Sequence, residues 1–566
     1  MTMQQPRRDF LIRLASVTST LSAGAVLSAC GGGEVPECRF DFGVASGDPL
    51  SDRVILWTHA RYVDNDDAVD LEWQVATDAS FNSVVASGAA RASEAAGYTA
   101  KADATGLSPG RDYHYRFRAG AYLSAVGRTR TLPAGALAEL RLAVMSCTNH
   151  PAGFFNVYAE VARSDAQYML HLGDYIYEYS STGYASQRAA ALQRVPEPAN
   201  EILTLADYRR RHAQYKSDPD SKTLHATLPL IAVWDDHELA NDAWREGAQN
   251  HTESTEGSFA TRRAVAIQAY HEWMPIRTGS DPARIYRSFD FGNLVSLHML
   301  DTRLVGRDRQ IEITSLVNPA TAASAQAALV SPSRQLLGLE QLGWLQARLQ
   351  ASTARWQVLG QQVLMARMEF PVSVLSALNP ADTSPAALAA GQAAVNAFLM
   401  AKGKRAAGVP LSAQEAALLD PRSNPRLGYN LDAWDGYPAA REVLLSTVAQ
   451  LRKNLVVLSG DTHNAWHSDL TLLNGTKVGE EFATPSVSSP GLEEVLAALT
   501  PAQLKGIYEG VVDTLKWMDA SRRGYLRMTF TPSQARGQWS FVSRIDSRSY
   551  TVDTPTAAET RPYTLS

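Results

Sequence analysis

Four short apolar runs in this chain each stop at side chains that can bind a metal ion. A run of about five Val, Ile, Leu and Ala residues predicts a buried strand, and the abrupt polar residue marks its carboxyl end. Open α/β sheets place their sites at that edge, so the four ends predict one shared site. The mixed ligand types, without a glycine-rich phosphate loop, indicate several metal ions rather than a nucleotide. The runs are RLAVMSC, YMLHLGDYIY, LIAVWDDHE and NLVVLSGDTH, which end at Cys147, at Asp174 and Tyr177, at Asp235, Asp236 and His237, and at Asp461 and His463.

The length and composition predict a large globular chain with more than one domain. It has 566 residues, of which 45% are hydrophobic and 20% are charged, and one core rarely serves so long a chain. The net charge of −5 and the lack of a basic cluster interleaved with aromatic residues provide no field for nucleic acid. We therefore expect no nucleic-acid partner, and we expect a monomer.

Residues 1–33 predict an export signal and a flexible tether, which take no part in the fold. The sequence PRRDFLIR resembles the twin-arginine signal, which carries folded proteins across the bacterial inner membrane. Arg, Ser and Thr interrupt the apolar stretch 11–29, so we expect no permanent transmembrane helix. The string LSAC, ending at Cys30, resembles a lipobox, which predicts a lipid-anchored protein of the periplasm or cell surface. The alternative is a cleaved signal in which Cys30 is incidental.

The three cysteines do not form a disulfide framework. If Cys30 carries lipid, Cys38 and Cys147 remain, and a disulfide between these two is one interpretation. Cys147 follows a strand beside the other candidate ligands, which favours a free thiolate at this position.

Two domains and an insertion are expected. Residues 38–135 predict a small β-sandwich that resembles a fibronectin type III domain, with alternating aromatic residues on one face and a packing or lid role. Residues 140–545 alternate strands with helical stretches, which predicts a layered α/β domain. The Ala-rich segment 371–425 predicts a helical insertion, for which we favour a solvated hairpin without function over a segment that arches over the site.

The motif GDYIY predicts a hard anionic pair at the second strand end. Gly173 allows a tight turn, Asp174 then faces the pocket, and Tyr177 returns to the same side. Aspartate and phenolate suit a trivalent iron, whose charge lowers the phenol pKa. Alone, the same string also fits an ordinary strand followed by a turn.

Two further motifs predict cation sites. Asp235 and Asp236 are adjacent carboxylates after an apolar run, and a buried pair repels unless cations hold both ionised. The alternative is a solvated turn. Asp461 and His463 lie two residues apart, and on extended backbone their side chains point to one side, where both can bind a metal.

The ordered motifs along the chain resemble those of a known family. They are SC, GDYIYEY, DDHE, LDTR, LDAWDGYPAAR and GDTH. The set resembles the PhoD family of alkaline phosphatases and phosphodiesterases, within the calcineurin-like metallophosphoesterases, and it covers essentially the whole chain. The resemblance implies an α/β fold, a four-layer αββα sandwich, behind the fibronectin III-like domain. It also implies an exported enzyme that hydrolyses phosphate esters by attack of a metal-activated hydroxide or oxide.

The resemblance also implies one ferric iron and two calcium ions as cofactors. The residues it implies as iron ligands are Cys147, Asp174 and Tyr177, with Asp174 as a bridge. The residues it implies for calcium, or as bridges, are Asp236, Asn241, Asp461 and His463. Asp242 departs from the family, which often has a second asparagine at this position, and adds a negative charge there.

Three residues are candidates for catalysis. Asp235 and His237 either bind a metal or hydrogen-bond the phosphate. Arg303, in LDTR, is a candidate fork for the phosphate, or it forms a structural ion pair. In LDAWDGY, Trp434, Asp435 and Tyr437 suit the rim of the site, or a rigid loop that packs on itself.

Two other functions remain open at this stage. A phosphodiesterase, like the phospholipase D-like enzymes of the same family, is the alternative within this chemistry. A non-catalytic surface lipoprotein that keeps metals only for folding is an alternative of a different class.

Overall fold

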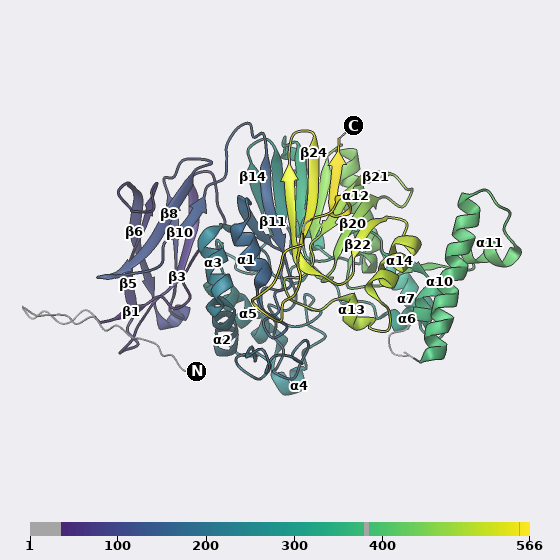
Figure 1. Ribbon diagram of the computed structural model, residues 1–566, viewed down its shortest axis with the longest axis horizontal. Coiled ribbons are helices and arrows are strands. Elements are labelled where there is room, and N and C mark those ends of the chain that lie inside the picture. The colour runs from purple at the N-terminus through teal and green to yellow at the C-terminus, as the bar shows by residue number, and fades with distance from the viewer. Residues whose placement is uncertain (1–35, 379–383, 554, 566) are drawn as a thin grey trace, which may run out of the picture. The chain divides into compact units, whose positions relative to one another are not determined.

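The computed structural model describes residues 36–378, 384–553 and 555–565 (Figure 1). The expected export signal, the tether and Cys30 lie outside these residues. Within the described ranges, no helix combines the length and the apolar character needed to cross a membrane.

A large mixed sheet carries three of the four apolar runs at its centre. The strands β11, β12 and β13 lie side by side and parallel, and every residue of β12 and β13 is buried. Because parallel neighbours end at one edge, their carboxyl ends meet there. In spatial order the strands are β25 (Thr560–Thr564), β24 (Gln534–Val542), β23 (Arg523–Phe530), β11 (Leu140–Met145), β12 (Tyr168–His171), β13 (Leu230–Ala232), β2 (Val44–Gly47), β3 (Arg53–His59) and β7 (Thr99–Thr105).

A second sheet carries the fourth apolar run. Its strands β15, β16, β19 and β21 are parallel, and β19 is fully buried. In spatial order the strands are β14 (Arg287–Phe291), β15 (Val295–Met299), β16 (Trp356–Gly360), β19 (Leu455–Ser459), β21 (Lys477–Ala483), β20 (Ala465–Thr471) and β22 (Leu515–Asp519).

The main hydrophobic core joins these two sheets, since Val144 and Ile231 of the first share a cluster with Val358 and Val456 of the second. Helices beside the first sheet contribute to the same cluster, and Figure 1 shows them grouped near β11. They are α1 (Asn156–Arg163), α2 (Leu205–Ser217), α3 (Pro219–Thr227) and α5 (Phe259–Trp273). A second cluster joins β19 to α8 (Gly338–Ala351), α12 (Pro438–Gln450) and α14 (Pro501–Val511).

The N-terminal region is β-rich, and its aromatic residues Tyr113, Tyr115 and Phe117 all face a buried cluster, as the alternation predicted. It shares a sheet with the rest of the chain, because β2 pairs in parallel with β13 at Gly47 and Leu230. A separate sheet holds β10 (Gly127–Arg130), β8 (Asp112–Ala119), β5 (Val69–Ala76) and β6 (Val84–Ala92), with β9 (Tyr122–Leu123) beside β8, and β1 (Cys38–Arg39) pairs with β4 (Arg61–Tyr62).

The Ala-rich segment is helical and lies between two paired strands, β17 (Glu369–Pro371) and β18 (Arg426–Gly428). Its helices are α9 (Val372–Leu375), α10 (Pro385–Ala406) and α11 (Ala413–Leu419). Lys402 of α10 donates from Nζ to the backbone oxygen of Gly510 in α14, at 2.7 Å. Short helices elsewhere are α4 (Glu253–Glu256), α6 (Ile313–Val317), α7 (Ala322–Leu329) and α13 (Leu492–Val495).

Candidate metal centre

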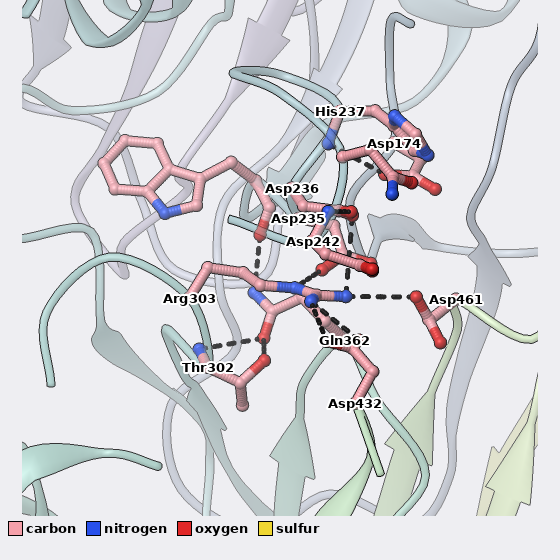
Figure 2. A network of polar contacts seen from close by, with 12 residues as sticks. Asp174, Asp235, Asp236, His237, Asp242, Thr302, Arg303, Gln362, Asp432 and Asp461 are labelled. Carbon is pink, nitrogen blue, oxygen red and sulfur yellow. Dashed lines mark hydrogen bonds and ion pairs between the residues drawn. The ribbon is translucent and has the colours of Figure 1, made fainter. Parts of the chain in front are cut away.

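Three groups of side chains bring possible ligand atoms within 4.8 Å of one another. Asp174 belongs to two of them and Asp236 also belongs to two, so the three groups form one continuous cluster. Figure 2 shows most of this cluster converging from separate loops. The groups are Cys147, Asp174 and His463; Asp174, Asp236 and His237; and Asp235, Asp236 and Asp461.

The strand ends explain this convergence. Cys147 follows β11, Asp174 follows β12, and Asp235 to His237 follow β13 in the first sheet. Asp461 and His463 follow β19 in the second sheet. The carboxyl ends of strands from both sheets therefore supply the cluster.

Several of these residues have left-handed backbone, which non-glycine residues rarely adopt. The φ angle is 58° at Cys147, 55° at Asp174, and 63° at both Asp461 and His463. Each such conformation costs on the order of 1–3 kcal/mol, and such residues gather at functional sites. The backbone thus turns sharply at the point where each strand delivers its ligand.

This geometry corrects the expectation that Asp461 and His463 point to one side from extended backbone. Both residues have left-handed backbone rather than extended backbone, although both line the cavity. His463 joins Cys147 and Asp174, whereas Asp461 joins Asp235 and Asp236.

A buried thiol and a buried phenol flank Asp174. Neither described cysteine forms a disulfide, so Cys38 does not pair with Cys147. The hydroxyl of Tyr177 donates to Asp174 Oδ2 at 2.9 Å and accepts from Ser489 Oγ at 2.6 Å. Burial and the Asp174 carboxylate raise the pKa of Cys147 and of Tyr177 well above their usual ranges. Both groups therefore keep their protons unless a cation displaces them.

The carboxylates of Asp235, Asp236 and Asp461 carry an excess of negative charge. Burial raises the pKa of Asp235 and of Asp461 well above the usual range, against the lowering effect of Arg303. Burial opposes ionisation of Asp236 too, but Arg303 and His237 lower its pKa to about 2. Among the described residues, Asp235 Oδ2 and Asp236 Oδ1 have no hydrogen-bond partner. Arg303 Nη2 lies 3.5 Å from Asp236 Oδ1, beyond hydrogen-bond reach of ideal length. Buried oxygens of this kind fit bound cations, because a cation would replace the hydration that each has lost.

Arg303 lies at the centre of these carboxylates and is fully buried (Figure 2). Its Nε pairs with Asp235, its Nη1 lies 2.7 Å from Asp432 Oδ2, and its Nη2 lies 3.1 Å from Asp461 Oδ1. The guanidinium is not among the described groups that line the cavity. The geometry therefore favours the structural ion pair over the phosphate fork, since each of the three guanidinium nitrogens already has a carboxylate partner.

His237 is held by a residue that the sequence motifs did not single out. Its Nδ1 lies 2.7 Å from Oε2 of Glu178, a fully buried carboxylate. The other oxygen of Glu178 accepts from the backbone N–H of Asn241 and from Asn250 Nδ2, each at 2.9 Å. Burial lowers the pKa of His237, but Asp236 and Glu178 outweigh it and raise that pKa well above the usual value. Glu178 follows Tyr177 directly in GDYIYEY, so its place in that motif was the available signal.

A second carboxylate, Glu238, ties two strand ends together. It accepts from the backbone N–H groups of Asp174 at 3.0 Å, Tyr175 at 2.6 Å and Asp235 at 2.8 Å. Burial and the Asp174 charge raise the pKa of Glu238 to about 8. The residue therefore positions the backbone of two candidate ligands rather than facing the cavity.

Asn241 and Asp242 both line the cavity beside this cluster. The Asn241 side chain donates to Gln249 Oε1 at 3.0 Å, and the Asp242 backbone N–H donates to Asp236 Oδ2 at 2.6 Å. Burial and the charges of Asp432 and Asp236 raise the pKa of Asp242 to about 7. The extra carboxylate at this position therefore adds to the surplus of negative charge.

Trp434, Asp435 and Tyr437 of the LDAWDGY loop do not line the cavity, and their side chains bond to other segments of the chain rather than to the loop itself. Trp434 donates from Nε1 to Gln361 at 2.7 Å, and Tyr437 donates to the backbone oxygen of Asp308 at 2.6 Å, both from buried side chains. Asp435 is also buried. The residue of this loop that reaches the cluster is Asp432, which the sequence analysis did not single out.

A cavity of about 470 Å³ opens beside the cluster, within the range of small-molecule sites. Candidate ligands line one part of it, aromatic and aliphatic side chains line another, and Asn430 and Thr462 also contribute. Its polar lining includes Asp174, Asp236, His237, Asn241, Asp242, Asp461 and His463, and its apolar lining includes Phe370, Leu375, Tyr429, Leu492, Val495, Leu496 and Tyr508.

The fold and this site define the class: an α/β protein with a cluster of sulfur, oxygen and nitrogen ligands for several cations beside a small-molecule cavity. Residues 142–539 match the family model described as PhoD-like phosphatase, and residues 28–133 match that of its N-terminal domain. The chain is 35% identical over 517 residues to alkaline phosphatase D of Bacillus subtilis (strain 168), covering 88% of this chain and 77% of the relative. A solved structure titled "Structure of PhoD" matches with a TM-score of 0.71 and 29% identity, covering 95% of this chain and 94% of that one.

This chain belongs to the PhoD-like phosphatase family. It is therefore a phosphoric ester hydrolase, as the motifs predicted, and it acts on phosphate esters. The family assignment favours an enzyme over a non-catalytic surface lipoprotein.

Proposed function

We propose that the chain acts as an alkaline phosphatase on phosphate monoesters. The reaction takes place at the cation centre, which is formed by the loops that follow the strand ends. The observation that carries the proposal is the pair of buried oxygens without a hydrogen-bond partner among the described residues, Asp235 Oδ2 and Asp236 Oδ1, beside a cavity lined by Asp174 and His237. Phosphodiester hydrolysis is the second candidate, because the cavity of about 470 Å³ extends beyond the candidate ligands to a lining of aromatic and aliphatic side chains.

The donor types suggest which residues hold which ion. Cys147, Asp174 and Tyr177 suit one ferric ion, since thiolate and phenolate are strong anionic donors, and His463 lies in the same group. Carboxylate and amide oxygens suit two calcium ions. We assign to calcium Asp235, Asp236, Asn241 and Asp461. Held by these residues, the cations would supply charge neutralisation at the phosphoryl oxygens and a nucleophile at mild pH.

The chain's own residues set the positions of these donors. Arg303 holds Asp235 and Asp461 in place by charge-assisted hydrogen bonds. Glu178 fixes the ring of His237 through Nδ1, which leaves Nε2 to hydrogen-bond a phosphate oxygen in the cavity. The roles of Asp235 and Arg303 are therefore to build the site, and that of His237 is to contact the substrate.

We also propose the finer architecture. The two sheets with helices on their outer sides support a four-layer αββα sandwich over residues 140–545, with an insertion near 371–425. The sheet of β5, β6, β8 and β10, packed against β3 and β7, supports a fibronectin III-like domain over residues 38–135.

Export and anchoring rest on the sequence of residues 1–33. We propose a twin-arginine route to the bacterial periplasm or cell surface, a lipid on Cys30, and a monomeric enzyme. Mass spectrometry of protein made in a bacterial host tests the lipid, and a Cys30→Ser variant that keeps the same mass increment contradicts it.

Hydrolysis of p-nitrophenyl phosphate against bis-p-nitrophenyl phosphate tests the function. The proposal predicts a higher kcat/KM for the monoester. A strong preference for the diester contradicts the proposal and supports the second candidate.

A further inference from the structure

The catalytic cavity is lined by two kinds of surface that come from different elements. The candidate ligands lie in the loops after β12, β13 and β19. The apolar lining comes from β17, α9, α13, α14 and the residue after β18. Exposing an apolar surface to water is unfavourable in free energy, and a ligand that covers the surface removes this cost.

The apolar lining is preformed. The rings of Phe370 and Tyr508 pack edge to face with a centroid distance of 4.9 Å, and those of Tyr429 and Tyr508 do so with a centroid distance of 5.5 Å. Phe370 and Tyr508 belong to the hydrophobic cluster around α14, and Leu492 and Leu496 pack against it. The wall is therefore an extension of the core rather than a set of isolated exposed side chains.

The Ala-rich insertion helps to build this wall. Its first helix, α9, contributes Leu375 to the cavity lining. Its long helix, α10, holds α14 through Lys402, which bonds the Gly510 backbone and lies 2.6 Å from Asp513. The insertion is thus attached to the element that carries Tyr508, which supports a part for it in this side of the cavity.

We propose that this wall is a subsite for an apolar group attached to the phosphate, so that the enzyme selects alkyl or aryl phosphates over polyhydroxylated esters of similar size. The inference rests on the proposed function, because it places the phosphate at the cation cluster. An apolar group gains by leaving water for this wall. A polyol would lose hydrogen bonds there that Phe370 and the leucines cannot replace.

Two alkyl esters of similar size test the proposal: butyl phosphate and glycerol 1-phosphate. We expect the metal-loaded, unaltered protein to show a higher kcat/KM for butyl phosphate. Replacing a wall residue by an amide should lower the ratio of the two values by about 10-fold. The variants are Leu496→Gln and Val495→Gln, and Val495 is 62% exposed, so its replacement leaves the fold intact. The control is Leu339→Gln in α8, 76% exposed and outside the lining, which should leave the ratio unchanged.

The outcomes separate this inference from the function on which it rests. A ratio at or below one in the unaltered protein, or an unchanged ratio in both variants, overturns the subsite while the phosphatase stands. Failure to hydrolyse either ester or p-nitrophenyl phosphate overturns the proposed function and the subsite with it. Inhibition by butylphosphonate no stronger than by methylphosphonate also overturns the subsite, without relying on any variant.

Discussion

Cys147 and Tyr177 are protonated in the cation-free protein, whereas metal ligation requires their anionic forms. Burial raises the pKa of both Cys147 and Tyr177, so each holds its proton in the cation-free protein. Ligation therefore releases protons, and cation affinity should rise with pH. Removing the thiol or the phenol should therefore change cation binding as well as activity.

Tyr177→Phe should lower bound iron and reduce kcat/KM by about 100-fold or more, because it removes a donor but keeps the ring. The ring stacks on His237 at a centroid distance of 4.3 Å, so packing survives. Elemental analysis and steady-state kinetics measure the two effects. The matched control is Tyr286→Phe, which loses a hydroxyl bonded to Glu340 away from the centre. Unchanged iron in Tyr177→Phe would remove this residue from the ligand set.

Glu178→Gln should lower kcat/KM by about 10- to 100-fold with metal content retained. The amide weakens the hydrogen bond that orients His237, while Asp174 and Asp236 stay in place. Glu246→Gln is the control, since its side chain is 73% exposed and pairs only with Arg245. Equal kinetics in both variants would mean that the orientation of His237 does not matter.

At the scale of elements, the site depends on sharp turns after buried strands. Gly173 has a φ of 107°, and an added Cβ would lie 2.4 Å from Asp235 Cβ and 2.5 Å from its backbone nitrogen. The loops after β12 and β13 therefore touch at a point where only glycine fits.

Gly173→Ala should reduce the free energy of unfolding by about 3 kcal/mol or more, from left-handed strain and overpacking together. Gly475→Ala isolates the first effect, because Gly475 has a φ of 85° and nothing within 4 Å. We expect this control to lose only about 1–2 kcal/mol. Urea denaturation of both variants measures the difference, and equal losses would show that the close approach to Asp235 is not limiting.

The strand ends could be predicted from the sequence because an apolar run followed by a ligand marks one edge of a sheet. The group of ligands that Asp461 and His463 each join could not be predicted, because both residues have left-handed backbone. His463 is also held by contacts with a distant loop, at Ser486 and Pro490. The pairing of Arg303 was likewise open, since its partners Asp235, Asp432 and Asp461 come from three distant segments. Local sequence patterns therefore predict the strands, whereas tertiary contacts determine the geometry of the centre.

For the whole molecule, the surplus of buried carboxylates links stability to pH. The pKa of Glu238 is raised from 4.5 to about 8, and that of Asp242 from 3.8 to about 7. A raised carboxyl pKa means that the folded chain binds the proton more tightly than the unfolded chain does. The stabilisation is complete below the unfolded values and is lost as the pH rises through the folded values. Asp236, with a pKa of about 2, acts only below this window.

Glu238 and Asp242 should therefore make the chelated protein lose stability relative to the cation-loaded protein as the pH rises from about 5 to about 8, because bound cations hold the nearby carboxylates ionised. The difference between the two forms is the quantity to follow, since burial lowers the pKa of histidines such as His59 and His271 to about 4 and gives both forms an opposite dependence on pH. Calorimetric melting of both forms across this range measures the effect. A gap in melting temperature between the two forms that narrows as the pH rises over this interval would contradict the sign of these shifts.

The proposed centre is mixed, with iron held by thiolate and phenolate and calcium held by carboxylates. Elemental analysis of the protein purified from a bacterial host that exports it tests this most directly. The account predicts one iron and two calcium ions per chain, both lost with activity on chelation. Zinc alone, in an active enzyme, would contradict it.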